Sequence, residues 1–249
     1  MNGVQSEVRR VVLGHPSGNQ FFIHLARALD GAGQLASVAT CIDWRLAGAC
    51  GRLIPRSLSD ELGRRSFSGA IGRPVARHPW REASRLLAGR LGLVRLVRHE
   101  TGFFSVDSVY RDFDRWTARR LHRIAGAGIA YAYEDAAEAT FIEAKRLGWA
   151  RAYDLPIAYW ETSRRLLEEE AARLPGWEPT LGGTRDSMEK LERKSRELAL
   201  ADLVVCPSRF VADSLPKWAH EGKRVVVAPF GSPVPGEISP SAGRSPRSP

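Results

Sequence analysis

The sequence predicts an α/β protein built on a parallel sheet with helices on both faces. Short apolar segments alternate along the chain with longer segments in which apolar residues recur at helical spacing. The apolar segments read as continuous runs, which favours strands buried on both faces. Parallel strands need helical crossover connections, and the intervening segments provide them.

The predicted elements follow one another as βα units. The first unit is a strand over 8–13, a loop GHPSGNQ and a helix over 21–29 that stops before Gly31 and Gly33. A strand over 35–42 follows, and the region 45–101 is Gly- and Arg-rich with a basic helix as its only clear feature. The later elements are a helix over 104–124, a strand over 129–133, a helix over 136–147, a strand over 150–155, helices over 159–174 and 187–201, a strand over 203–206, a helix over 208–218 capped by Ser208, and a strand over 224–228.

Composition predicts one globular domain over 1–231 and a tail over 232–249. The chain has 249 residues, of which 43% are hydrophobic, and the Ser/Pro/Arg-rich tail offers nothing to bury, so we expect it to be disordered. No apolar run of membrane-spanning length and no signal peptide is visible, which predicts a cytoplasmic protein. Three cysteines without CxxC spacing indicate neither a disulfide framework nor a zinc site.

The net charge of +9 is concentrated in one region. Residues 45–123 hold 17 arginines and no lysine against 7 acidic residues. Within it, 79–99 reads as a helix with one apolar side flanked by arginines. The apolar positions are Trp80, Ala83, Leu87, Leu91 and Val94, and the flanking positions include Arg81, Arg85, Arg90, Arg95 and Arg98. Either the apolar side of this helix faces the core and its arginines are solvated, or the helix lies on the inner face of an anionic membrane. Binding of nucleic acid is disfavoured, because no aromatic residues that could stack on bases are interleaved with the arginines.

Ligands of parallel α/β sheets bind outside the carboxyl ends of the strands. After the first strand, Gly14, His15, Ser17 and Gly18 precede a helix N-terminus, a place able to receive a phosphate or a sugar hydroxyl. The alternative for His15 is a loop histidine bonded to backbone. The pattern matches neither GxGxxG nor GxxxxGK, which excludes the dinucleotide and P-loop fingerprints.

Carboxylates follow two later strands. Tyr133, Glu134 and Asp135 come after one, and Asp154 after the next. A positioned carboxylate can orient an acceptor hydroxyl or take its proton, although Glu134 and Asp135 could instead cap the following helix and Asp154 could form a turn. Tyr159 and Ser208 complete the set of candidate ligand-binding side chains.

One match to a metal-binding motif does not indicate a metal site. Asp112-Phe113-Asp114 has the DxD form of a metal-binding motif but lies within a predicted helix between Arg111 and Arg115. We therefore expect a solvated, ion-paired helical face there and no metal site.

An ordered set of motifs resembles a known family. YAYED, YDLP, ELALADLVVCPSRFV and the closing KRVVVAPFG are similar to the first domain of retaining GT-B-fold glycosyltransferases, often called glycosyl transferases group 1. The resemblance implies a Rossmann-like acceptor-side domain, one half of a GT-B fold. It places Gly14 to Gly18 and Ser208 at the interdomain cleft, and Tyr133, Glu134, Asp135 and Asp154 toward the acceptor. The second domain, which would hold the sugar nucleotide, is not expected in this sequence.

The function implied by the resemblance is transfer of a hexose from a nucleoside-diphosphate sugar to a saccharide or lipid-linked acceptor, without a metal and with no cofactor beyond the donor. Glu134, Asp135 and Asp154 are the expected catalytic residues. The alternative is a non-catalytic subunit that binds glycan or docks a separate donor-binding subunit, which predicts an exposed apolar patch along the cleft.

Overall fold

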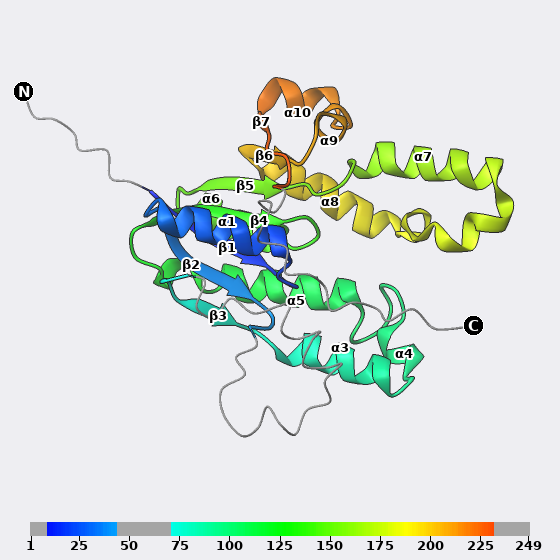
Figure 1. Ribbon diagram of the computed structural model, residues 1–249, viewed down its shortest axis with the longest axis horizontal. Helices are drawn as coiled ribbons and strands as arrows, with labels where there is room; N and C mark the ends of the chain where they lie inside the picture. The colour runs from blue at the N-terminus through cyan, green and yellow to red at the C-terminus, as the bar shows by residue number, and fades with distance from the viewer. Residues whose placement is uncertain (1–8, 44–70, 232–249) are drawn as a thin grey trace, which may run out of the picture.

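The computed structural model describes residues 9–43 and 71–231. The predicted tail over 232–249 and much of the unassigned basic region lie outside the described residues. In the described part, seven parallel strands form one sheet in the order β3-β2-β1-β4-β5-β6-β7 (Figure 1). The strands are β1 (Arg10–His15), β2 (Leu35–Thr40), β3 (Val75–Arg77), β4 (Ala127–Tyr133), β5 (Ala150–Asp154), β6 (Leu203–Cys206) and β7 (Arg224–Val227).

Helices connect these strands. The α-helices are α1 (Gln20–Gly31), α3 (Trp80–Arg90), α4 (Val94–Val97), α5 (Val106–Ala118), α6 (Glu138–Arg146), α7 (Trp160–Arg173), α8 (Met188–Leu200), α9 (Arg209–Asp213) and α10 (Lys217–Gly222). Short 3-10 helices are η2 (Leu121–Arg123), η3 (Pro175–Thr180) and η4 (Gly182–Arg185). No helix in the described ranges is long and apolar enough to cross a bilayer.

Helices cover both faces of the sheet, which confirms the predicted fold class. Val11 and Leu13 of β1 pack with Phe22 of α1 on one face. Val12, between them, belongs to the cluster of Leu121 and Ala144 on the other face. Successive side chains of a strand point to opposite faces, so a strand buried on both sides is apolar throughout.

The strand order reverses at the centre of the sheet. β1 pairs with β2 on one side and with β4 on the other, and the chain runs outward from these two central strands in opposite directions. Such a reversal opens a crevice at the carboxyl ends of the strands, where α/β proteins bind ligands.

Two predicted helices are shorter than expected. The helix predicted over 104–124 begins at Val106, because Ser105 caps it, and gives way after Ala118 to η2. The helix predicted over 208–218 is interrupted between α9 and α10, because Pro216 lacks the N–H that a continuous helix needs. β3 was not predicted; three residues between Pro74 and His78 are too few for a periodic signal.

The basic helix predicted over 79–99 is two helices, and its apolar side does not face the core. Gly92, at φ +67°, ends α3 in a left-handed conformation, and α4 starts two residues later. Leu87 and Leu91 are 58% and 64% exposed, whereas Glu82 is buried. The core-facing interpretation is therefore wrong, because periodicity identifies an apolar side without showing which way it points.

The cap of α5 gives a first testable prediction. Ser105 is fully buried, and its Oγ accepts a hydrogen bond from the Ser108 backbone N at 3.1 Å. Ser105→Ala is expected to lower the free energy of unfolding by about 1 kcal/mol, measured by urea denaturation. Ser84→Ala, inside α3, is the matched control and should cost less, because alanine is a better helix former. Equal losses in the two variants would contradict a capping role.

Candidate functional site

A cavity of about 800 Å³ opens at the carboxyl ends of the central strands. Side chains from the start of α1 line one wall, and the ends of β4, β5 and β6 line the floor. Phe21 and Phe230 stack at a ring-centroid distance of 3.8 Å and form part of the lining. A second cavity of about 300 Å³, lined mainly by apolar residues with Arg120 and Arg123, contains no carboxylate. The larger cavity is therefore the candidate site.

Asp154 is the carboxylate of this cavity. It is the last residue of β5, and its side chain is hydrogen-bonded to the Tyr131 hydroxyl. Burial raises the pKa of Asp154 to about 6, and the hydrogen bond from Tyr131 acts in the opposite direction. Asp154 is thus mostly ionised at neutral pH and can accept a hydrogen bond from a ligand hydroxyl.

Tyr133 also lines the cavity, at the end of β4. Its ring lies 4.1 Å from the His15 ring, centroid to centroid, and meets Tyr110 edge-on at 6.5 Å. Burial raises the pKa of Tyr133, so its hydroxyl stays protonated and can donate a hydrogen bond. Tyr133 and Asp154 are the two predicted site residues that the structure brings together in the cavity.

His15 shapes the turn between β1 and α1. Its Nδ1 accepts hydrogen bonds from the backbone N atoms of Ser17 at 3.2 Å and Gly18 at 3.0 Å. Burial lowers the pKa of His15 to about 3, so the ring is neutral. Gly18 has φ +57°, which this turn requires, and Gly14 lies buried within β1. This arrangement corresponds to the backbone-bonded alternative for His15.

Asn19 is a cavity residue that the sequence reasoning did not single out. Its Oδ1 accepts from the Phe22 backbone N at 2.8 Å and so caps α1, while its Nδ2 lies 3.4 Å from His15 Nε2. The available signal was an Asn directly before an apolar helical run, which is the pattern of an N-cap. Asn19 therefore brings a polar side chain and the N-terminus of α1 to the cavity wall.

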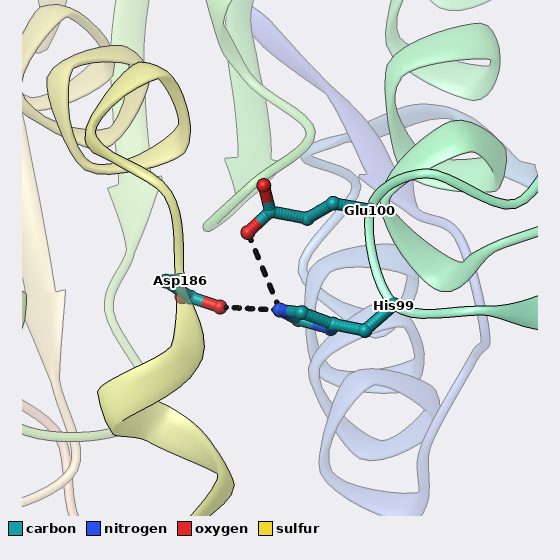
Figure 2. A group of neighbouring side chains, drawn as sticks. All are labelled: His99, Glu100 and Asp186. Atoms are coloured by element: carbon teal, nitrogen blue, oxygen red, sulfur yellow. Dashed lines mark hydrogen bonds and ion pairs between the residues drawn. The ribbon is translucent and has the colours of Figure 1, made fainter.

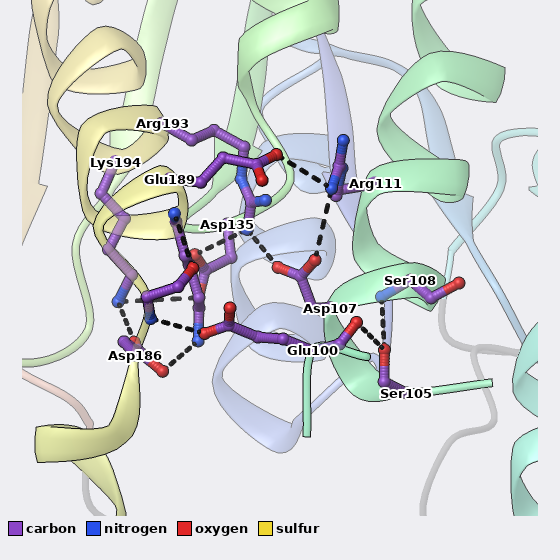
Figure 3. A network of polar contacts seen from close by, with 12 residues as sticks. Glu100, Ser105, Asp107, Ser108, Arg111, Asp135, Asp186, Glu189, Arg193 and Lys194 are labelled. Atoms are coloured by element: carbon purple, nitrogen blue, oxygen red, sulfur yellow. Dashed lines mark hydrogen bonds and ion pairs between the residues drawn. The ribbon is translucent and has the colours of Figure 1, made fainter. Parts of the chain in front are cut away.

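Glu134 and Asp135 do not line the cavity; they belong to a buried network of charges with α8. Figure 3 shows Asp135 in this network together with Arg193 and Lys194. Lys194 Nζ lies 3.3 Å from Glu134 Oε1 and 3.6 Å from Asp135 Oδ2. Arg193 pairs with Asp107 and lies 3.3 Å from Asp135 Oδ1. Burial raises the pKa of Glu134 to about 7, opposed by the neighbouring Lys194.

Glu197 holds the turn that carries these two acids. It is fully buried and accepts hydrogen bonds from the backbone N atoms of Asp135 at 2.9 Å and Ala137 at 3.2 Å. Asp135 has φ +70°, an uncommon conformation for a residue other than glycine. α8 thus fixes the turn between β4 and α6 from the side opposite to Tyr133.

The helix α6 is capped from a distance. Asp114 of α5 accepts from the backbone N atoms of Ala139 at 2.7 Å and Thr140 at 2.9 Å. The capping alternative for Glu134 and Asp135 is therefore wrong. The predicted solvated face is also wrong for Asp114, which is buried, whereas Asp112 is ion-paired with Arg81 at 3.4 Å and lies 2.8 Å from His78 Nε2.

Tyr159 and Ser208 also lie outside the cavity lining. Tyr159 is 1% exposed, and its hydroxyl is 3.0 Å from Ser195 Oγ within the core. Ser208 Oγ accepts from the Val211 backbone N at 3.2 Å, which confirms it as the N-cap of α9.

A second polar cluster joins the loop before α5 to the loop before α8 (Figure 2). His99 Nε2 lies 3.0 Å from Asp186 Oδ1 and 3.3 Å from Glu100 Oε1. Asp186 also accepts from Lys190 Nζ at 2.8 Å, and the Ser187 backbone N donates to Glu100 at 2.9 Å. Because Lys190 competes with any metal cation for Asp186, these side chains favour a polar contact between the two loops over a metal site.

Comparison with solved structures places the fold. The chain matches a crystal structure of TcCGT1 in complex with UDP at a TM-score of 0.55 and 12% identity, covering 94% of this chain and 54% of that protein. It also matches a UDP-glucosyltransferase from Polygonum tinctorium capable of glucosylating indoxyl, in a complex with 3,4-dichloroaniline. This match has 14% identity and covers 96% of this chain and 55% of that protein. Its TM-score is 0.45, which is too low to support a shared fold.

Neither a scan of protein-family models nor a search of curated proteins finds a match. The chain spans about half the length of the two structural neighbours. At 12% identity the likeness to TcCGT1 concerns the fold alone. The protein is thus a Rossmann-like α/β domain with a ligand-sized cavity at its switch point, as expected for one half of a GT-B fold.

Proposed function

We propose that this chain is the acceptor-side half of a glycosyltransferase that transfers a hexose from a nucleoside-diphosphate sugar to a hydroxyl of a saccharide or lipid-linked acceptor. The observation that carries the proposal is the cavity at the carboxyl ends of the strands, with the ionisable Asp154 in it. The fold shared with a protein crystallised with UDP supports it. The motif resemblance points to the same class.

The cavity offers the groups that such a transfer uses. Asp154 accepts a hydrogen bond from the acceptor hydroxyl, and Tyr133 and Asn19 supply polar contacts to other hydroxyls. The acceptor oxygen forms a bond to C1 of the hexose while the bond from C1 to the diphosphate oxygen breaks. The diphosphate leaves with the electron pair of that bond, and the acceptor proton passes to Asp154 or to the leaving group. Asp154 is therefore the proposed catalytic residue.

The wall formed by the start of α1 suits the anionic half of the donor. α1 is twelve residues long, and its N-terminus faces the cavity through Asn19 and Gln20. The helix dipole stabilises negative charge at this end. The resemblance implies retention of the anomeric configuration and no metal requirement. NMR of the product and assays in EDTA would test these two points.

A non-catalytic docking subunit is the second candidate, and the apolar rim favours it. Phe21 and Phe230 are 44% and 49% exposed at the cavity and could be covered by a donor-binding partner. This role would keep glycan binding in the cavity while the donor is held by a separate chain.

Ligand binding and transfer by the purified chain distinguish these functions. A panel of UDP-, GDP- and dTDP-hexoses is tested with 4-nitrophenyl glycosides as acceptors, with binding followed by ligand-observed NMR and transfer by mass spectrometry. Ala28→Trp fills the cavity from the exposed side of α1, and Arg27→Trp, one position earlier and outside the lining, is the matched control.

Transfer that is lost only in Ala28→Trp supports the enzyme. Glycoside binding without transfer, lost in the same variant, supports the docking subunit. Absence of both binding and transfer across the panel would overturn the assignment of this cavity.

A further inference from the structure

The outer side of α3 and α4 carries an unusual density of exposed apolar side chains. Eight of the nineteen large apolar side chains that are exposed in the described residues lie between positions 80 and 106. We call them the α3 surface: Trp80, Leu87, Leu91, Leu93, Val94, Leu96, Phe103 and Val106. Trp80, Leu87 and Leu91 repeat at helical spacing, so they share one side of α3 and its C-terminal end. Such a patch marks an interaction site more often than a random surface does.

Polar contacts hold α3 in this orientation. Arg81 donates to the Phe103 carbonyl at 2.8 Å and to Ser108 Oγ at 2.5 Å, which ties α3 to the start of α5. Its guanidinium carbon lies 4.6 Å from the Trp80 ring centroid and 4.5 Å from that of Phe103. The Trp80 and Phe103 ring centroids lie 6.5 Å apart, so the same guanidinium contacts both rings.

The charges around the α3 surface have one sign. Residues 79–106 hold five arginines and only two acids, Glu82 and Glu100. Glu82 is 3% exposed and pairs with Arg85, and Glu100 accepts from the Ser187 backbone N. Arg95 and Arg98 are exposed beside the apolar side chains of α4. The face presented to solvent is therefore apolar and cationic.

We propose that the α3 surface docks the protein peripherally onto an anionic lipid bilayer. A bilayer accepts apolar side chains below the head groups and arginines among the phosphates, which is the combination present here. α3 and α4 lie at the edge of the molecule, outside α5, so a flat surface can reach them (Figure 1). This inference does not depend on the proposed transfer activity, because its test measures binding alone.

Co-sedimentation of the full chain with lipid vesicles tests this proposal. Binding to vesicles containing phosphatidylglycerol is expected, with little binding to pure phosphatidylcholine and weaker binding at high salt. Leu87→Asp with Leu91→Asp, and separately Arg95→Glu with Arg98→Glu, should each lower the partition coefficient at least about tenfold. Ile142→Asp on α6 and Arg119→Glu at the far end of α5 are exposed matched controls and should bind like the unchanged protein. Circular dichroism checks that all variants are folded.

Two outcomes would overturn the proposal. One is no vesicle binding, or binding that the α3-surface variants lose no more than the controls. The other is concentration-dependent self-association in sedimentation velocity that disappears in Leu87→Asp with Leu91→Asp, which would make the α3 surface an interface between copies of this chain.

Discussion

Replacing Asp154 by asparagine is expected to lower the rate of hexose transfer by about 100-fold or more, with a smaller change in KM. Asparagine keeps the size of the side chain but cannot take a proton or carry the negative charge that orients the acceptor hydroxyl. Positioned acid–base groups typically contribute 10²- to 10⁴-fold. Steady-state kinetics of the complete transfer system measures the effect, and an unchanged rate would remove Asp154 from the chemistry.

The pH dependence gives a second readout of the same carboxylate. Burial raises the pKa of Asp154 to about 6, and the ionised form is the one required. Activity should therefore be full above this pH and fall as the pH drops through about 6. Asp154→Asn should lack this acidic limb. Tyr131→Phe is the matched variant: it removes a hydrogen bond that lowers the pKa of Asp154, so the limb should move to higher pH.

The largest expected loss of stability follows removal of Lys194. Lys194→Met should lower the free energy of unfolding by about 3 kcal/mol or more, because it removes the cation 3.3 Å from the buried Glu134, whereas Asp135 keeps Arg193 at 3.3 Å. The loss should be smaller at acidic pH, where Glu134 can be protonated. Urea denaturation at two pH values measures both effects.

A second substitution separates charge from packing. Glu134→Gln in the Lys194→Met background removes the buried negative charge that has lost its Lys194 partner, and should restore part of the stability. Arg146→Met breaks an exposed pair with Glu143 and should leave stability unchanged within error. A Lys194→Met loss no larger than that of Arg146→Met would show that the buried network is not coupled to folding.

The sequence predicts six of the seven strands, because most of their residues are apolar, and misses only the three-residue β3. It also predicts Asp154 and Tyr133 as cavity residues, because ligands gather at the carboxyl ends of parallel strands. The sequence does not show that Tyr133 lines the cavity while the next residue, Glu134, does not. Adjacent residues at a strand end point to opposite faces, so the alternation in β4 contained that information, but which face carries the cavity depends on where α1 packs.

Other features depend on long-range contacts that leave no local pattern. In the sequence Asp114 resembles a charged surface position, yet it is buried, because its carboxylate accepts hydrogen bonds from the backbone N–H groups at the N-terminus of α6. The apolar side of α3 is visible in the sequence, but its outward direction is set by Arg81 reaching α5. Partners in both cases are more than 20 residues apart in the chain.

β4 serves two surfaces that can change independently. Tyr131 and Tyr133 face the cavity, while the turn that follows them is held from behind by α8 through Glu197. Ligand preference can therefore be altered on the α1 side without disturbing the buried charges, and stability can be adjusted from α8 without altering the cavity wall. A library confined to the exposed lining residues Gln20, Phe21 and His24 of α1 should accordingly yield mostly folded proteins with changed specificity.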